Sequence, residues 1–334
     1  MTTRSLQKEM ETAIRAVIAA SQLCTRVRAT LVDRFTMVKD DRSPVTIADY
    51  GSQALICRIL KDTFPHDAVV AEEDAETLTR QENRGLLRDV VREVNSLFPG
   101  LSSRDVCAAI NWGSQNPADR FWTLDPIDGT KGFLRGDQYA IALALIEDGH
   151  VRLGVLGCPN LVRTAGSEED DGRTIFVALR SQGAFETDLH LRQKNPIRVS
   201  NTAAPAEARM TESYESSHTD HGSHQRIVSH LKMANPPVRM DSQAKYAVLA
   251  RGDTAVYLRL PSPRSPNYRE RIWDHAAGSI IIEEAGGRVT DVCGRPLDFS
   301  QGKKLLMNQG IVATNGRLHE VVLQAVGIEL KINP

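Results

Sequence analysis

The stretch WTLDPIDGTKGF, residues 122–133, decides how the rest of this 334-residue chain is interpreted. Residues 121–124 have the continuous apolar character of a buried strand. The density of Asp, Gly and Pro over residues 125–136 then predicts a turn-rich loop. A second apolar strand is expected over residues 139–147.

Two carboxylates in this loop are spaced so that they can share a cation. Pro126 fixes φ and Gly129 permits a tight turn, so Asp125 and Asp128 can converge on one centre. The carbonyl of Ile127 could be a further oxygen ligand. Oxygen ligands without a neighbouring His or Cys favour a hard cation, with Mg²⁺ as the first choice and Zn²⁺ disfavoured. The alternative is a turn whose Asp side chains only accept main-chain hydrogen bonds.

Three further acidic residues interrupt apolar segments in a similar way: Asp49, Glu72 and Asp274. A buried carboxylate carries a heavy desolvation cost unless it is paired or metal-bound, so several such residues together indicate a cation. Asp274 also stands at the start of a helix expected over residues 276–284. Its alternative role there is an N-cap, worth about 1 kcal/mol, and the same helix start suits a phosphate anion.

The order of the predicted elements indicates a layered α+β and α/β arrangement. Helices are expected over residues 5–35, 47–60, 225–233, 246–250 and 276–284, and a helical surface region over 77–119. Strands are expected over residues 68–71, 121–124, 139–147, 151–156, 175–179, 197–199, 255–260 and 288–290. A boundary near residue 160 would divide the chain into an N-terminal domain, 1–160, and a C-terminal domain, 161–334.

The composition excludes several classes of protein. The 41 Lys and Arg residues against 42 Asp and Glu give a net charge of −1, which does not favour long nucleic acid as a partner. No apolar run approaches the roughly 18 residues of a membrane span, and the first residues lack a signal-peptide core, so a soluble cytoplasmic protein is expected. Five cysteines without a C-x-x-C pair favour reduced thiols. A monomer is the expected oligomeric state.

Four blocks of sequence together resemble the inositol monophosphatase superfamily. They are Asp49 after Ser-Pro-Val-Thr, the pair Glu72-Glu73, the run 122–133, and the W-D-x-A-A-G…E-A-G-G run over 273–287. These blocks span most of the chain. Shorter segments resemble more closely the 3′(2′),5′-bisphosphate nucleotidases within that superfamily: residues 133–138, 157–160, 241–246 and 257–261.

This resemblance implies a fold and an activity. The fold would be a layered α/β/α/β/α sandwich with the site between its two halves. The activity would be that of a magnesium-dependent, lithium-inhibited phosphatase that converts adenosine 3′,5′-bisphosphate (PAP) to AMP and also acts on its sulfated analogue PAPS. Two or three Mg²⁺ ions are expected in the site.

The resemblance also implies roles for particular residues. The metal ligands would be Glu72, Asp125, the Ile127 carbonyl, Asp128 and Asp274, with Glu73 as a weaker candidate. Asp49 and Thr130 would orient and deprotonate the attacking water. Because a threonine hydroxyl is too weakly acidic to be a base alone, Thr130 would position a proton toward Asp49.

The implied substrate contacts come from both halves of the chain. They are Gly129, Thr130, Ser242, Lys245, Arg259, Asp274 and a histidine in the 215–224 loop. Lys245 and Arg259 would hold the retained 5′-phosphate. Among the three histidines of that loop the flanking sequence favours His218, while His221 and His224 stay open as alternatives.

Two other functions remain open on the sequence. The same site could take an inositol phosphate such as inositol 1,4-bisphosphate, because Lys245 and Arg259 do not distinguish a ribose from an inositol ring. A protein that binds PAP without turning it over is disfavoured, because the set of acidic residues is intact.

Overall fold

The structure, a computed structural model, describes residues 5–34, 44–162, 173–214, 221–262, 265 and 267–332. For residues 31–34, 44–46 and 221 it describes the backbone only. The helices are α1 (Gln7–Arg34), α2 (Pro44–Thr63), α3 (Glu76–Thr79), α4 (Arg84–Asn95), α5 (Ser103–Asn111), α6 (Thr130–Arg135), α7 (His221–His230), α8 (Ala244–Ala250), α9 (Ala276–Glu284) and α10 (His319–Leu330). Short 3₁₀ turns are η1 (Gln81–Asn83), η2 (Pro205–Glu207) and η3 (Ile272–Asp274).

The strands form two sheets. A seven-stranded sheet has its strands in chain order: β1 (Ala68–Ala71), β2 (Arg120–Asp128), β3 (Ala140–Glu147), β4 (His150–Cys158), β5 (Thr174–Leu179), β6 (Gly183–Thr187) and β7 (Asn195–Pro196). A five-stranded sheet has the order β11 (Arg288–Thr290), β12 (Ile311–Thr314), β10 (Val256–Arg259), β8 (Met210–Glu212) and β9 (Val238–Arg239). In the first sheet β1 pairs parallel to β2 and the other neighbours are antiparallel.

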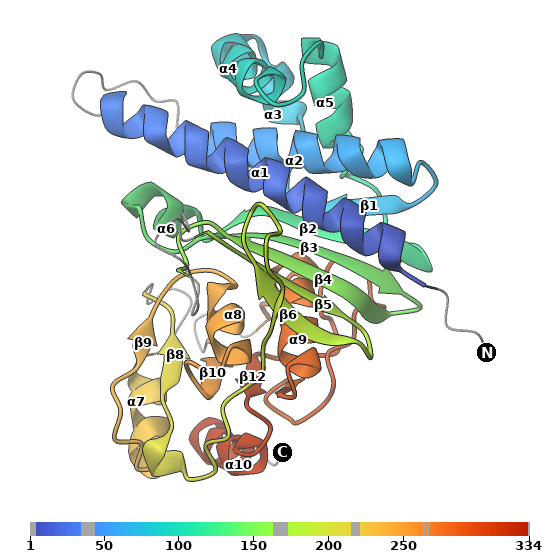
Figure 1. Cartoon of the computed structure of the whole chain (residues 1–334). Coiled ribbons are helices and arrows are strands. Elements are labelled where there is room, and N and C mark those ends of the chain that lie inside the picture. Colours follow the sequence, from blue (N-terminus) through green and yellow to red (C-terminus); the bar gives the residue numbers. More distant parts are fainter. Residues whose placement is uncertain are drawn as a thin grey trace.

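Helices and sheets alternate in five layers (Figure 1). Helices α1 and α2 cover one face of the first sheet, and α8 and α9 lie between the two sheets. Helices α7 and α10 cover the outer face of the second sheet. The expected α/β/α/β/α sandwich is therefore confirmed, with α3, α4 and α5 as an additional layer near α2.

The residues of β3 show why both faces of the first sheet are covered. Its odd-numbered Ile and Leu residues join the core beneath α1 and α2. Its even-numbered alanines join the core beneath α9. A strand that alternates between two apolar sets must be buried on both faces.

Helix α9 sits close to the first sheet because the sheet surface beneath it is made of small residues. A Cβ added to Gly154 on β4 would lie 2.5 Å from Cγ2 of Ile280 and 2.8 Å from the carbonyl oxygen of Ala277. Residues 276–282 of the helix are buried. A helix that is apolar around its circumference is typical of such a central layer. Asp274 lies just before this helix, in the turn η3.

Most predicted elements are confirmed, with small shifts at their ends. Two predictions are wrong. Residues 125–136 do not form one loop, because β2 continues to Asp128 and α6 follows directly. Residues 197–199 form no strand, since the strand that pairs with β6 is 195–196 and Ile197 adds only one main-chain hydrogen bond, to Ala184. Strands β6, β8, β9 and β12 and helix α10 were not predicted. The division near residue 160 stays a prediction, and the strands after it, β5–β7, complete the first sheet.

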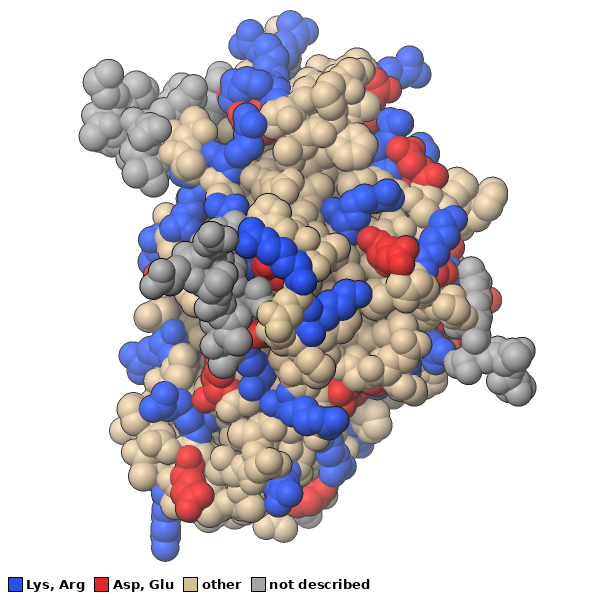
Figure 2. Space-filling model, in the orientation of Figure 1, with Lys and Arg blue, Asp and Glu red and all other residues tan. Residues whose placement is uncertain are grey.

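Surface and thiol properties agree with the composition. All five cysteines are free, and Cys24, Cys57 and Cys158 are buried. On the face shown in Figure 2, basic and acidic side chains of the described residues are interspersed. None of the helices in the described part of the chain combines the length and the apolar character needed to cross a bilayer.

Candidate active site

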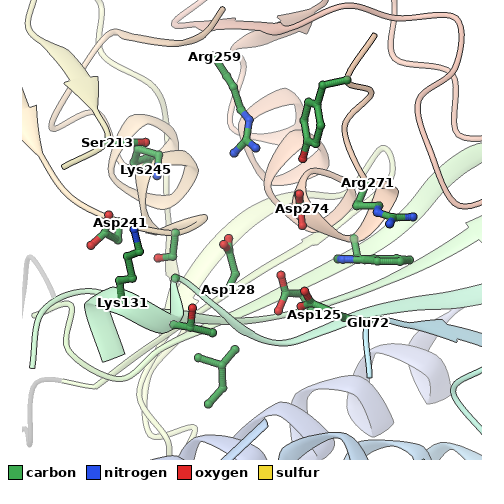
Figure 3. Close-up of a pocket in the computed structure, with 16 residues that line it drawn as sticks. Glu72, Asp125, Asp128, Lys131, Ser213, Asp241, Lys245, Arg259, Arg271 and Asp274 are labelled. Carbon is green, nitrogen blue, oxygen red and sulfur yellow. The ribbon is translucent and has the colours of Figure 1, made fainter. Parts of the chain in front are cut away.

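A cavity of about 350 Å³ lies where the carboxyl ends of β1 and β2 face the start of α8 and the turn η3 (Figure 3). Parallel strands end at the same sheet edge, so Glu72 and the last residues of β2 are brought together there. The cavity is lined by Glu72, Asp125, Ile127, Asp128, Gly129, Thr130, Lys131, Ser213, Asp241, Ser242, Lys245, Arg259, Tyr268, Arg271, Trp273 and Asp274.

A β-bulge in β2 places both of its aspartates on the cavity side. Asp125 pairs with Ala142 and Asp128 with Ala140, so three residues of β2 advance against two of β3. Without the bulge, residues three apart would point to opposite faces. Ile127 itself is buried in the core beneath α1 and α2, so it can offer the cavity its main-chain carbonyl.

Gly129 joins β2 to α6 in a conformation that favours glycine. Its φ is +86°, and an added Cβ would lie 2.9 Å from Cβ of Ser242. Ser242 also has a positive φ of 67°. The two chain segments therefore meet backbone to backbone, and Thr130 begins α6 at the cavity wall.

Four carboxylates point into one end of the cavity: Glu72, Asp125, Asp128 and Asp274 (Figure 3). Burial, together with the charges of Glu72 and Asp128, raises the pKa of Asp125 well above its ordinary value. Asp125 is 3% exposed, and its Oδ1 has no hydrogen-bond partner among the described residues. A buried carboxylate oxygen without a partner needs a proton or a cation.

Asp274 and Glu72, two further carboxylates of this end, also have raised pKa values. Desolvation raises the pKa of Asp274, and Asp128 adds to the shift. Glu72 opens onto the cavity, yet desolvation by the surrounding wall raises its pKa as well. Such an all-oxygen set with mutual repulsion fits a hard divalent cation such as Mg²⁺.

Asp49 lies behind this cluster, on the buried face of α2. It is 6% exposed, and burial followed by the charges of Glu73 and Glu72 raises its pKa well above the usual range. Thr130, its predicted partner, lines the cavity. Burial and Glu72 raise the pKa of Glu73 to about 7. The predicted roles of these residues stay predictions.

Two cations, Lys245 and Arg259, line the wall formed by α8 and β10, which we call the cationic end, and Asp241 lies near Lys245 (Figure 3). Lys245 is buried, its Nζ lies 5.5 Å from the centre of the Tyr257 ring, and burial lowers its pKa to about 8. Arg259 enters from the end of β10 and donates from Nε to Glu270 Oε1 at 2.8 Å. Ser242 lies at the start of α8, so the three predicted contacts converge on one wall.

The predicted histidine contact is less well placed. His218 lies outside the described residues, and for His221 only the backbone, at the start of α7, is described. His224 is buried 3.6 Å from Glu212 and does not line the cavity. The alternative of His224 as a contact is not supported by this arrangement, because its ring is enclosed by protein.

Six residues line the cavity that were not predicted: Lys131, Ser213, Asp241, Tyr268, Arg271 and Trp273. Lys131 and Trp273 stand inside the sequence blocks quoted above, and Asp241 directly precedes Ser242. Tyr268 and Arg271 lie in the loop that leads into η3. Their nearness in sequence to predicted residues was the available signal.

Comparison with known proteins identifies the family of this chain. The family model described as "Inositol monophosphatase family" matches residues 5–330. The chain belongs to the inositol monophosphatase family. Within it, a rice protein named 3′(2′),5′-bisphosphate nucleotidase is 44% identical, over 97% of this chain and 94% of its own. A fission yeast (Schizosaccharomyces pombe) protein of the same name is 39% identical, over 99% and 98%.

Solved structures of the inositol monophosphatase family share the fold. An inositol monophosphatase from Zymomonas mobilis superimposes with a TM-score of 0.66 at 19% identity, covering 96% of this chain and 98% of its own. One from Anabaena gives a TM-score of 0.63 at 22% identity, with 98% of each chain covered. The expectation of the superfamily's fold is therefore confirmed.

Proposed function

We propose that this protein is a phosphatase that removes the 3′-phosphate of PAP and leaves AMP, as a 3′(2′),5′-bisphosphate nucleotidase. One observation carries the proposal. A single cavity has a carboxylate cluster on the wall formed by β1, β2 and η3, and on the wall formed by α8 and β10 it has two cations, the buried Lys245 and the half-buried Arg259. A substrate with two phosphates matches this polarity, since one phosphate can meet the cations while the other meets the metal-binding end.

The metal-binding end would hold Mg²⁺ through Glu72, Asp125, Asp128, Asp274 and the Ile127 carbonyl, with Glu73 nearby. The unpartnered Oδ1 of Asp125 supports this assignment. Bound divalent cations would neutralise phosphate charge and lower the pKa of a water molecule. Two or three ions are the number we expect. Competition of Li⁺ for this end would give the expected lithium inhibition.

The residues of the chain itself would handle the attacking water. Asp49 has a raised pKa from burial and from Glu73 and Glu72, so it is suited to accept a proton. Thr130 stands at the cavity wall, where its hydroxyl can orient a water or relay its proton. No covalent phosphoenzyme is needed for such an in-line displacement.

The cationic end would retain the 5′-phosphate. Arg259 offers planar two-point contact and Lys245 a point charge. Ser242, Gly129 and Thr130 would complete the substrate contacts along the wall between the two ends. PAPS carries its sulfate at the same end as the 5′-phosphate, so we expect it to be a substrate as well.

The test is phosphate release from PAP, inositol 1,4-bisphosphate and inositol 1-phosphate, each with Mg²⁺ and with or without millimolar Li⁺. We expect preference for PAP and inhibition by Li⁺. Preference for inositol 1,4-bisphosphate would contradict the nucleotide substrate but keep the metal site. No release from any of the three would contradict the enzymatic function itself.

A further inference from the structure

The wall behind the cationic end contains a chain of buried polar side chains that does not line the cavity. Glu270, in the loop before η3, accepts from Arg259 Nε at 2.8 Å through Oε1. Its other oxygen, Oε2, lies 3.1 Å from His275 Nε2. The second ring nitrogen of His275 lies 2.7 Å from the Tyr246 hydroxyl. Glu270 is 8% exposed and His275 is 1% exposed, so water does not compete for these contacts.

This chain connects three parts of the site. Tyr246 follows Lys245 on α8, and His275 follows Asp274 at the entrance of α9. Glu270 is further fixed by its main-chain carbonyl, which accepts a 2.9 Å hydrogen bond from Leu305 N. Glu270, whose carboxylate holds Arg259, is therefore fixed by His275 through its side chain and by Leu305 through its main chain.

The contact made by Glu270 limits where Arg259 can point. Glu270 takes the Nε–H, and Tyr257 and Tyr268 interact electrostatically with the guanidinium. A guanidinium has five N–H donors, so donors remain for a ligand in the cavity that Arg259 lines. The carboxylate of Asp274 also acts on Arg259. Carboxylate oxygens of Glu270 and Asp274 lie within 4.8 Å of each other, so without Glu270 the guanidinium would turn toward Asp274 alone.

We propose that Glu270 is a positioning residue that holds the Arg259 guanidinium in one orientation beside Asp274, with its remaining donors aimed at the second phosphate of the substrate. Glu270 itself touches no substrate. The inference rests on the proposed function, because it assigns a phosphate to Arg259. It makes the preference for a bisphosphate over a monophosphate depend on a residue outside the cavity.

The experiment compares two pairs of ligands on the full chain with Mg²⁺. AMP and adenosine differ by the 5′-phosphate in a calorimetric binding measurement, and PAP and 3′-AMP differ by it in phosphate release. For Glu270→Ala we expect AMP affinity and kcat/KM for PAP to fall about tenfold, mainly through KM, with 3′-AMP changed less than about threefold. Glu270→Gln keeps an oxygen toward Arg259, so it should restore part of the loss.

Reference variants separate the possible failures. Arg259→Ala should weaken AMP at least as much as Glu270→Ala, and the double variant should be no weaker than Arg259→Ala alone. Glu9→Ala removes another buried glutamate that pairs with an arginine, Arg120, far from the cavity. It should leave the PAP to 3′-AMP ratio unchanged.

Three results would overturn the proposal. If Arg259→Ala weakens AMP and Glu270→Ala does not, the positioning role is wrong while the 5′-phosphate assignment stands. If neither variant weakens AMP, the assignment of Arg259 to the phosphate fails, and the positioning role fails with it. If Glu270→Ala lowers turnover of PAP and 3′-AMP in equal proportion, Glu270 supports the fold or the metal-binding end instead.

Discussion

The main-chain N–H of Gln243 donates a 2.6 Å hydrogen bond to Oδ2 of Asp128. This contact joins the end of β2 in the first sheet to the segment that begins α8. The Gln243 side chain continues the connection, donating to the Trp273 carbonyl at 2.9 Å and accepting from Gly278 N at 3.0 Å. One residue thus ties together the carboxylate end, the cationic wall and the entrance of α9.

Replacing Gln243 by Leu should destabilise the protein. The change leaves the Trp273 carbonyl and the Gly278 N–H buried without their partner, at about 1–3 kcal/mol for each group. Urea unfolding should therefore show a free energy of unfolding lower by about 2–6 kcal/mol. Gln182→Leu on the exposed surface is the control, and it should change stability by less than about 0.5 kcal/mol. Equal effects of the two changes would contradict the connecting role of Gln243.

Asp125→Asn should separate metal binding from folding. The exchange removes a buried charge that Glu72 and Asp128 repel, so the metal-free variant should be at least as stable as the wild type. Thermal unfolding should show a Mg²⁺-dependent rise of Tm in the wild type that the variant lacks. Phosphate release should fall by at least about a hundredfold.

The exposed Asp253→Asn is the control for this variant. It should keep both the Mg²⁺ effect on Tm and the activity. A Tm of Asp125→Asn that still rises with Mg²⁺ as in the wild type would remove Asp125 from the metal-binding set.

Glu73 should make the metal-free protein less stable as pH rises. Burial and Glu72 raise its pKa from 4.5 to about 7, so the native state holds a proton that the unfolded state releases. The stability that this group contributes is fully present below about pH 4.5 and is lost as the pH rises through about 7. In urea unfolding with a chelator, Glu73→Gln should gain stability relative to the wild type between pH 5 and pH 8.

Taking the difference between the two proteins cancels the contributions of other titrating groups, such as the buried His275 and His319. Exposed Glu76→Gln should show no such gain. A difference between Glu73→Gln and the wild type that does not change with pH would show that Glu73 titrates normally.

Lys245 should impose a pH limit on substrate affinity. Burial lowers its pKa to about 8, so its charge is lost as pH rises through that value. The phosphate groups are already fully ionised there, since their second pKa is about 6. KM for PAP should therefore rise above pH 8, and Lys245→Arg should remove the rise because an arginine stays charged. The same exchange at exposed Lys61 should leave the profile unchanged, and a profile unaffected by Lys245→Arg would contradict the assignment.

The sequence predicts the composition of the site better than its geometry. Asp125 and Asp128 were expected to converge, and they do line one cavity. The reason is a bulge in β2 rather than a loop. Pro126 falls at this bulge, and a proline next to Asp and Gly is equally typical of a turn, so the pattern was interpreted as a loop. Helix α6 was missed because Gly129 and Gly136 at its ends are turn signals, and six residues are too few for a helical pattern.

The second half of the chain was harder to predict. Strands β8 and β9 have three and two residues, which is too short for an alternating pattern. β8 pairs with the edge of β10 that β12 leaves open, and β9 pairs in turn with β8. The burial of His224 against Glu212 depends on how α7 packs on this sheet, a tertiary contact that spacing along the chain does not reveal.

The most direct test of the account is the identity of the monophosphate formed from PAP in Mg²⁺, read by phosphorus NMR. If the carboxylate end acts on one phosphate while Lys245 and Arg259 retain the other, the product is 5′-AMP alone, with one inorganic phosphate released for each PAP. Formation of 3′-AMP, or of a mixture of the two, would contradict this orientation of the substrate in the cavity.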